Sequence, residues 1–231
     1  MIGITSFGGY VPRYRLDRSL IYKALGWMAP GNAGLARGEK AVAGFDEDSI
    51  TMAVAAGIDA LEGIDRTRVD ALCFASTSMP YKERLNAGIV KGALGLSDQI
   101  SAADFSSGIK AGTTALLYAL DSVKSERNSS ALVCASDMRL GRPASPQEMI
   151  FGDAAAALLV GHENVIAEFK GSFSTSHDFV DHYRGEFAKY DRQWEDRWIR
   201  DMGITELIPE AINGLLDKYS LQIGDFTKVV Y

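Results

Sequence analysis

The segment Ala103–Leu117 reads Ala-Asp-Phe-Ser-Ser-Gly-Ile-Lys-Ala-Gly-Thr-Thr-Ala-Leu-Leu, in which a run of small residues leads directly into an apolar helical pattern. Glycine and alanine occupy the first turn of the expected helix, which we place over Gly112–Ser125. A residue at such a turn lies at a helix N-terminus, where the dipole and free backbone N–H groups lower the pKa of a thiol and stabilise an oxyanion. The segment is therefore typical of a loop that presents a nucleophile.

Short apolar runs on both sides of this loop predict buried strands. The runs Ala-Leu-Cys-Phe-Ala and Ala-Leu-Val-Cys-Ala are almost continuously apolar, which is the pattern of strands covered on both faces. The predicted strands are Ile2–Tyr10, Ala71–Ala75, Ala131–Ala135, Ala154–Val160 and a last one that begins at Lys228–Tyr231.

Helical patterns alternate with these strands. The predicted helices are Asp48–Glu62, Asn86–Leu94, Gly112–Ser125 and Ile204–Tyr219. Acidic residues suit the start of the first helix, and Pro209 lies in the first turns of the last one, where proline is tolerated. Strands that alternate with helices predict an α/β fold in which helices pack on a sheet.

The same patterns divide the chain into three segments. Residues 1–170 hold the alternation, residues 171–203 are rich in aromatic and charged residues, and residues 204–231 open a second α/β unit. The middle segment has no clean strand pattern and predicts a surface excursion of the kind that often carries specificity. A strand at Lys228–Tyr231 would need a pairing partner, so we expect a fragment or one half of a split protein; a natural edge strand is the alternative.

Composition excludes several classes of function. The 231 residues include 24 basic and 30 acidic side chains, a net charge of -6, and no basic stripe that would favour nucleic acid. No apolar run approaches the roughly 20 residues that span a bilayer. The N-terminus lacks the order of a signal peptide, and two cysteines, Cys73 and Cys134, suit a reducing compartment. We therefore expect a cytoplasmic protein without membrane or nucleic-acid partners.

Several segments carry a family pattern in chain order. They are Ile2–Arg15, Ala75–Tyr81, Ala135–Asp137, Phe151–Ala157 and the Lys-Ala-Gly-Thr of Lys110–Thr113. The chain resembles the hydroxymethylglutaryl-CoA synthases of the thiolase superfamily, and Asp104 has the spacing found in the related ketoacyl synthase III enzymes. The resemblance implies a thiolase-like layered fold with a mixed five-stranded sheet and flanking helices, present here as its first half and the start of its second half.

The resemblance also places the catalytic positions, and two of them are substituted. The nucleophile position falls on Ile109, and an isoleucine cannot attack a thioester. The acid/base position falls on Thr77, which cannot act as a carboxylate base. The family's histidine would lie beyond Tyr231. Contacts to substrate are expected from Ser107, Gly108 and Gly152.

Other side chains are candidates to replace the missing catalytic groups. Ser106 and Ser107 lie beside the nucleophile position, but a serine needs an adjacent base, and small-residue packing explains both equally well. Cys73 and Cys134 lie in buried strand patterns and are expected to be inert. A metal site at His177 and His182 is conceivable, although surface histidines are the favoured interpretation. We expect no metal and no cofactor other than a CoA thioester as substrate or ligand.

Three functions are compatible with this pattern. The favoured one is a degenerate, non-catalytic subunit, or pseudoenzyme, that handles acyl-CoA and pairs with a catalytic homologue. The second is an active acyl-CoA condensing or thiolytic acyltransferase without the usual cysteine. The third is a simple acyl-CoA-binding protein. Expected partners are acyl-CoA, a thiolase-like subunit in a homo- or heterodimer, and a DUF35-type zinc-ribbon and OB-fold protein.

Overall fold

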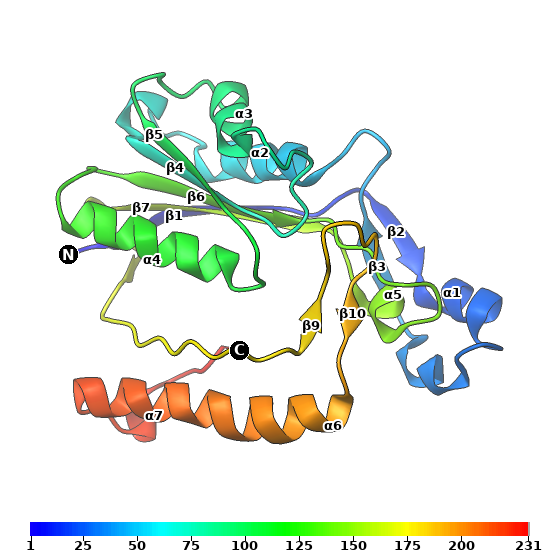
Figure 1. Ribbon diagram of the computed structural model, residues 1–231. Helices are drawn as coiled ribbons and strands as arrows, with labels where there is room; N and C mark the ends of the chain where they lie inside the picture. Colours follow the sequence, from blue (N-terminus) through cyan, green and yellow to red (C-terminus); the bar gives the residue numbers. More distant parts are fainter. Residues whose placement is uncertain (231) are drawn as a thin grey trace. The chain divides into compact units, whose positions relative to one another are not determined.

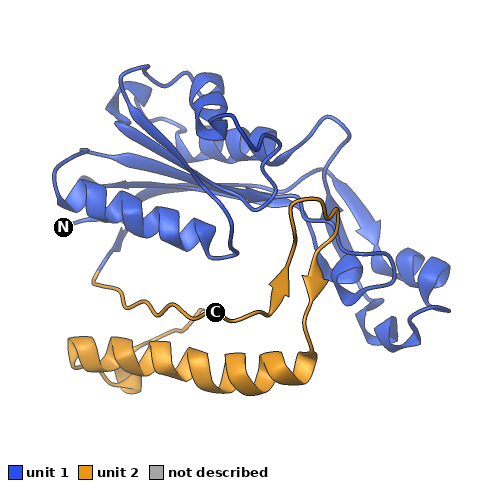
Figure 2. Ribbon diagram, in the orientation of Figure 1, with its two compact units in different colours: residues 1–169 blue, residues 170–231 orange. Residues whose placement is uncertain are grey.

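The computed structural model describes residues 1–230 and separates into two compact units (Figures 1 and 2). The first unit is Met1–Phe169, and the second begins at Lys170. The division falls one residue from the boundary placed after residue 170 on the sequence pattern. No helix among the described residues is long and apolar enough to cross a membrane.

A mixed six-stranded sheet forms the centre of the first unit, with the strand order β5-β4-β6-β7-β1-β8 (Figure 1). Strand β4 is parallel to β5 and β6, whereas β7 is antiparallel to β6 and β1. The strands are β1 (Gly3–Tyr10), β4 (Ala71–Ala75), β5 (Ser101–Phe105), β6 (Ala131–Asp137), β7 (Ala154–Gly161) and β8 (Ala167–Glu168). The predicted α/β class is confirmed, and the sixth strand, β8, is a two-residue addition to the expected five.

The two faces of this sheet are covered by different helices. Helices α2 (Ser49–Ala60) and α3 (Asn86–Ala93) cover one face, and α4 (Ala111–Lys124) lies on the other (Figure 1). Because side chains alternate along a strand, Leu72 and Phe74 enter the core under α2, whereas Cys73 enters the core under α4. The continuous apolar runs in β4 and β6 follow from this burial on both faces.

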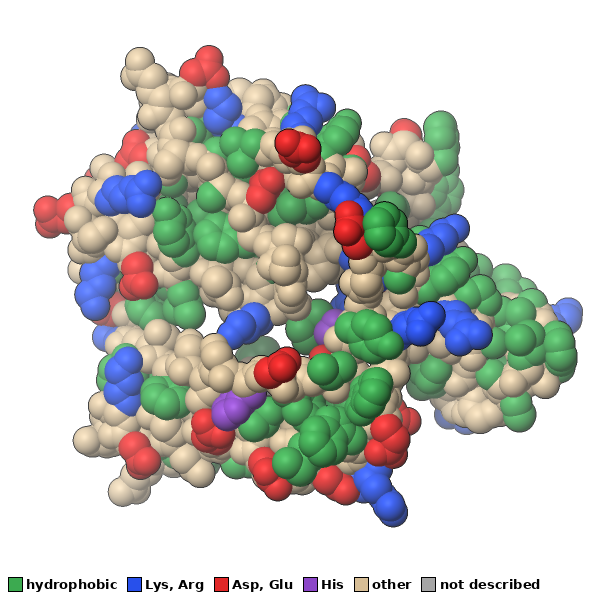
Figure 3. Space-filling model, in the orientation of Figure 1, with side chains coloured by type: hydrophobic (Ala, Val, Ile, Leu, Met, Phe, Trp, Pro, Cys, Tyr) green, Lys and Arg blue, Asp and Glu red, His purple; other side chains and the backbone are tan. Residues whose placement is uncertain are grey.

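An arm extends from the sheet and was not predicted from the sequence. It comprises β2 (Tyr14–Asp17), α1 (Arg18–Leu25), the 3-10 turn η1 (Pro30–Leu35) and β3 (Glu39–Val42), and α5 (Pro146–Ile150) packs against it. Figure 3 shows hydrophobic and basic side chains together over this arm, where Trp27 is 80% exposed. Its elements are short and mostly exposed, so no strong periodicity marks them in the sequence.

A long helical segment is the main element of the second unit. It runs through α6 (Asp196–Trp198), a wide π-type helix at Ile199–Leu207 and α7 (Ile208–Tyr219), and a short turn, η4 (Ile223–Asp225), follows. The rings of Phe179 and Phe173 pack close to Gly203 and Gly214, where a larger residue would clash. The predicted helix over Ile204–Tyr219 is therefore present and starts earlier than expected.

Two sequence predictions in this unit need correction. The excursion shows no clean strand pattern in the sequence, but β9 (His182–Tyr183) and β10 (Arg192–Gln193) form a small antiparallel hairpin there. Two residues are too few to leave an alternating pattern. The strand expected from Lys228 is absent over residues 228–230, which are exposed; Tyr231 lies outside the described residues.

Candidate functional site

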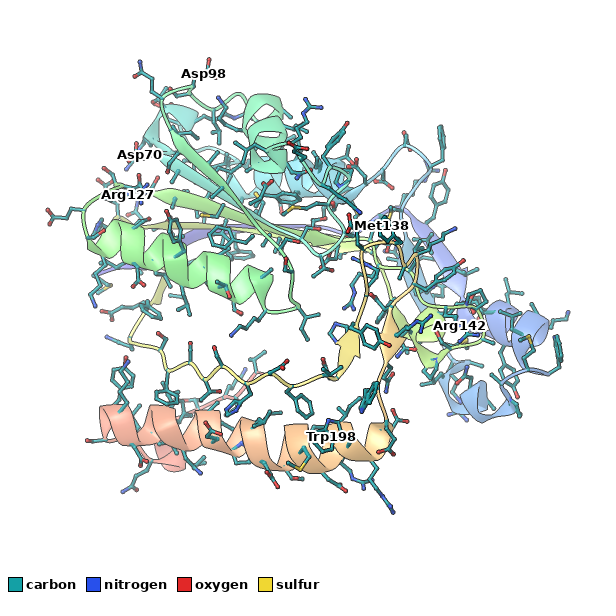
Figure 4. The ribbon with its side chains drawn as sticks, viewed as in Figure 1. Asp70, Asp98, Arg127, Met138, Arg142 and Trp198 are labelled. Atoms are coloured by element: carbon teal, nitrogen blue, oxygen red, sulfur yellow. The ribbon has the colours of Figure 1, made fainter. Side chains whose placement is uncertain are left out.

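A pocket of about 320 Å³ opens where β4 and β6 end and helix α4 begins. Ligands of open α/β sheets commonly bind at the carboxyl ends of the strands, and this pocket has that position. Met138, the residue after β6, marks this end of the sheet in Figure 4, and Asp70, the residue before β4, marks the opposite end. The pocket is lined by Ala75, Ser76, Thr77, Gly108, Ile109, Ala111, Gly112, Ala135, Ser136, Asp137, Ala154, Ala155 and Ala156.

The turn that precedes α4 contributes the wall at Ile109. Ser107, just before it, has a φ of 70°, in the left-handed region that non-glycine residues rarely adopt. The backbone N–H of Ala111 donates to the Gly108 carbonyl at 3.0 Å, and the cap residue Lys110 makes no side-chain capping bond. This tight turn leaves Ile109 60% exposed at the start of the helix.

The opposite wall is organised by the carboxylate of Asp137. Its Oδ1 accepts hydrogen bonds from Ser76 Oγ at 3.0 Å, Thr77 Oγ1 at 3.0 Å and Ser78 Oγ at 2.8 Å. It also accepts the backbone N–H of Thr77 at 2.8 Å. Asp137 thus holds the loop after β4 and orients the Thr77 hydroxyl as a donor. In the sequence, the Ala-Ser-Asp motif at this position indicates the family but not this role of Asp137.

The nucleophile and acid/base positions of the resemblance therefore line one pocket, although they are 32 positions apart in the sequence (Ile109 and Thr77). Neither side chain can form a covalent acyl intermediate or remove a proton as a carboxylate does.

Comparison with curated proteins decides the family. The chain is 33% identical over its whole length to hydroxymethylglutaryl-CoA synthase of Thermococcus gammatolerans, and it spans 65% of that relative. It is 32% identical to the synthase of Archaeoglobus fulgidus and spans 68% of it. This chain belongs to the hydroxymethylglutaryl-CoA synthase family. No family model matches the chain.

Solved structures agree with the thiolase-like fold of this family. A structure of HMG-CoA synthase complexed with CoA superimposes with a TM-score of 0.84 at 19% identity, covering 97% of this chain and 58% of that one. A variant of OleA from Xanthomonas campestris gives 0.86 at 17% identity, covering 98% and 74%. At these identities the likeness establishes the fold, and it confirms the predicted thiolase-like architecture.

Asp104, which has the family spacing, serves the start of helix α3. Its Oδ2 accepts the backbone N–H of Asn86 at 2.8 Å and the Asn86 side-chain amide at 3.0 Å, and its Oδ1 accepts the N–H of Ala87 at 2.6 Å. The first N–H groups of a helix have no partner within the helix, so a carboxylate stabilises them. Asp104 is the cap of α3, supplied from the neighbouring strand β5.

The three predicted substrate contacts have different surroundings. Gly108 lines the pocket, and Ser107 precedes it in the strained turn. Gly152 lies beside β3 instead, where a Cβ atom would meet the backbone of Ala41 at 3.6 Å. Next to it, burial raises the pKa of the Asp153 carboxyl, which accepts the N–H of Ala43 at 2.8 Å. Substrate contact by any of the three stays a prediction.

The cysteines and histidines offer no second reaction centre among the described residues. Burial raises the pKa of Cys73 to about 11 and that of Cys134 to about 12, the environment of inert core thiols. His177 Nε2 lies 3.1 Å from Glu210 Oε1, and His182 Nδ1 lies 2.9 Å from Asp181 Oδ1. In the described part of the chain, no group of three or more His, Cys, Asp or Glu side chains is arranged to hold a metal ion.

A second hollow of about 410 Å³ lies at the other end of the sheet. Asp70, Arg68 and His162 are among the side chains that line it. Arg68 is paired with Glu163, and both side chains are more than half exposed. Such exposed pairs contribute little free energy, and neither catalytic position of the family lies here. We assign the functional site to the pocket at Ile109.

Proposed function

We propose that this protein is a non-catalytic, acyl-CoA-binding member of the hydroxymethylglutaryl-CoA synthase family that pairs with a catalytic homologue. The observation that supports this most is the joint position of Ile109 and Thr77 in one pocket. A single substitution could leave a changed mechanism, but here both reacting positions are unsuited to acyl transfer while the pocket and its helix N-terminus persist.

The pocket has features that suit a bound thioester. Its walls are formed mainly by alanine and glycine, with Ile109 as the largest apolar side chain. The N-terminus of α4 carries about half a positive charge, which favours a carbonyl oxygen at the first turn. Structures with this fold include one complexed with CoA and one, MvaS, in complex with 3-hydroxy-3-methylglutaryl coenzyme A. We propose that this chain also binds CoA.

Pairing is supported by an open edge of the sheet. Strand β5 is hydrogen-bonded only to β4 in the described chain, so its outer edge can accept another strand. We propose that a thiolase-like subunit with an intact cysteine occupies this side, and that a DUF35-type zinc-ribbon and OB-fold protein joins the pair. A simple acyl-CoA-binding protein, the third hypothesis, would bind CoA without forming either contact.

The first test is acylation at position 109. The purified protein is incubated with acetyl-CoA and its intact mass is measured. We expect no covalent acetyl group on the wild type and one acetyl group on Ile109→Cys, because a thiol at the start of α4 has a lowered pKa. Ile109→Ser is the matched control, since its hydroxyl has no adjacent base to activate it. Acetylation of the wild type would contradict the non-catalytic proposal.

The alternative of an active enzyme has one observation in its favour. Ser107 adopts a strained backbone conformation, and strained residues gather at reaction centres. However, neither Ser106 nor Ser107 is hydrogen-bonded to a base among the described residues, and Ile109 separates them from the helix start. Peptide mapping of any acetyl adduct decides the question, because an adduct on either serine would support this alternative.

A further inference from the structure

The basic side chains of the first unit are concentrated on the arm. We define the arm surface as residues 11–42, which hold β2, α1, η1 and β3, together with residues 139–150, which hold α5. It carries eight lysine and arginine side chains and three acidic ones, a net charge of +5. Since the whole chain has a net charge of -6, all other residues together carry -11. The two ranges lie far apart in the sequence, so only the fold reveals this separation of charge.

Several cations of the arm surface have no partner. The side chains of Arg13, Lys23, Arg37 and Arg142 are exposed and form no hydrogen bond or ion pair within the described residues; Figure 4 labels Arg142. Arginine outnumbers lysine on this surface by six to two, whereas the rest of the chain has eight of each. Arginine is enriched and lysine is depleted in protein–protein interfaces. The composition therefore favours a protein partner.

Large apolar side chains accompany these cations. Tyr14, Leu20, Trp27 and Met28 are each more than half exposed, and Figure 3 shows hydrophobic and basic side chains together over the arm. Tryptophan, tyrosine and arginine supply most of the binding energy in protein interfaces. The arm surface has 32 residues in its first range and 12 in its second, more than the roughly 20–30 that one side of a standard interface uses.

Helix α2 and its flanking loops carry the opposite charge. Residues 45–65, which we call the acidic face, contain six acidic side chains and no lysine, arginine or histidine. Phe45 is fully exposed on this face and Ile58 is half exposed. The other side of α2 is buried against the sheet, where it contacts β1 and β7. The acidic face therefore offers negative charge and apolar contact to a surface that is basic and apolar.

We infer that the arm surface of one copy of this chain docks on the acidic face of a second copy. Charge complementarity selects this occupant, because the arm surface carries +5 and the acidic face carries -6. Two arm surfaces repel each other, so the contact joins unlike surfaces. A two-fold axis satisfies both surfaces at once, since each copy gives its arm and receives that of its partner.

This contact is separate from the pairing proposed at β5. The arm follows β1 in the chain, and α2 lies over β1 and β7, whereas β5 is at the opposite edge of the sheet. The contact also does not require acyl-CoA in the pocket at Ile109. It therefore goes beyond the proposed function and is tested independently of it.

Sedimentation velocity of the full chain tests the contact. Between about 1 and 100 μM protein, in about 0.05 M salt, we expect a reversible monomer–dimer equilibrium. CoA is left out, because its phosphate groups are anions that compete for the arginines. Raising the salt to about 0.5 M should weaken the dimer, since ions screen charges across an exposed interface. A chain that stays monomeric in low salt contradicts the inference.

Charge reversal of the arm surface should raise the Kd of the dimer roughly tenfold or more, because the arm then repels the acidic face. The arm variant is Arg13→Glu/Arg37→Glu/Arg142→Glu, which changes the charge of the arm surface from +5 to -1. The matched control makes the same change of charge away from both surfaces and should dimerise like the wild type. It is Lys124→Glu/Arg197→Glu/Lys228→Glu.

A second variant, Asp46→Arg/Ile58→Arg/Glu62→Arg, disables the acidic face and changes its charge from -6 to -1. It should also fail to dimerise alone. A one-to-one mixture of the arm variant and the face variant should form pairs again, because the intact arm of one meets the intact face of the other. Such pairs have one contact instead of two, so they should be weaker than the wild-type dimer.

The outcomes distinguish the possible occupants. If the arm variant dimerises like the wild type, or if the mixture of two folded variants stays monomeric, the inference is wrong. A monomeric wild type that co-sediments with vesicles of phosphatidylcholine and phosphatidylglycerol would assign the arm surface to an anionic lipid surface instead. Should either variant not fold, the wild-type equilibrium and its salt dependence decide the inference on their own.

Discussion

Ser136 and its neighbours in β6 point to opposite faces of the sheet. Ala135 and Asp137 alternate with it along β6, so its side chain points to the face that carries Leu132 and Cys134 under α2. The residue is 4% exposed, and its Oγ has no hydrogen-bond partner among the described residues. Ser136 therefore touches the functional pocket without directing its hydroxyl toward it.

We expect Ser136→Ala to raise the free energy of unfolding by about 1 kcal/mol, because a buried hydroxyl without a partner costs free energy that a methyl group does not. Urea denaturation measures the change. Ser122→Ala is the control, since the Ser122 hydroxyl is also buried but donates to the Ala119 carbonyl at 2.8 Å. A loss of stability in Ser136→Ala would show that a bound water satisfies this hydroxyl.

The structural role of Asp137 could not be predicted from the sequence alone. The motif Ala-Ser-Asp after a buried strand marks the family, but it does not reveal that four donors from residues 76–78 converge on one carboxylate oxygen. Those donors lie some 60 positions earlier in the chain. Only the parallel pairing of β4 with β6 brings the ends of the two strands together.

The N-terminus of helix α3 is capped by a residue from another element of the fold. Leu85 at its N-cap offers no side-chain capping bond, and Asp104 at the end of β5 supplies the acceptors instead. We expect Asp104→Ala to lower the free energy of unfolding by about 1–3 kcal/mol, because two backbone N–H groups lose a charged acceptor. Hydrogen exchange should quicken in the first turn of α3.

A matched control is available in the same region. Asp98 is almost fully exposed and pairs with Lys91 of α3, and exposed pairs of this kind contribute less than about 1 kcal/mol (Figure 4). Asp98→Ala should therefore change the urea midpoint only slightly. Equal losses in Asp98→Ala and Asp104→Ala would mean that the carboxylates act through net charge rather than through the cap.

The length of each element and the regularity of its apolar pattern determined how well it could be predicted from the sequence. The helices α2, α3 and α4 were located to within a residue or two, because each repeats apolar residues at helical spacing over eight or more positions. Strand β5 was not predicted as a strand. Its sequence, Ser-Ala-Ala-Asp-Phe, shows little alternation of apolar and polar residues and looked like small residues leading into the loop. The arm and the hairpin of β9 and β10 are shorter still and left no pattern.

The proposed pairing with a catalytic homologue is tested on the whole molecule. When the protein is co-expressed with a tagged family member that has the active-site cysteine, we expect the two chains to co-purify in equal amounts. The N–H of Ser101 donates to Asp70 on the β4 side, and donors alternate along a strand, so the N–H of Ala102 faces the open edge of β5. Replacing Ala102 with proline removes this outward donor and should abolish co-purification while CoA binding persists. A stable complex that forms regardless of this change would place the contact elsewhere, and a homodimer that turns over acetyl-CoA would contradict the pairing proposal.

The class of fold, the main strands and helices and the family could be predicted from the sequence alone, because these depend on residue type and on local periodicity. The tertiary structure decided that Ile109 and Thr77 line one pocket, that Asp137 rather than a catalytic group organises its wall, and that Asp104 caps α3. It also placed Gly152 beside β3. These facts depend on contacts between residues far apart in the chain, which the order of strands in the sheet creates and which no local pattern encodes.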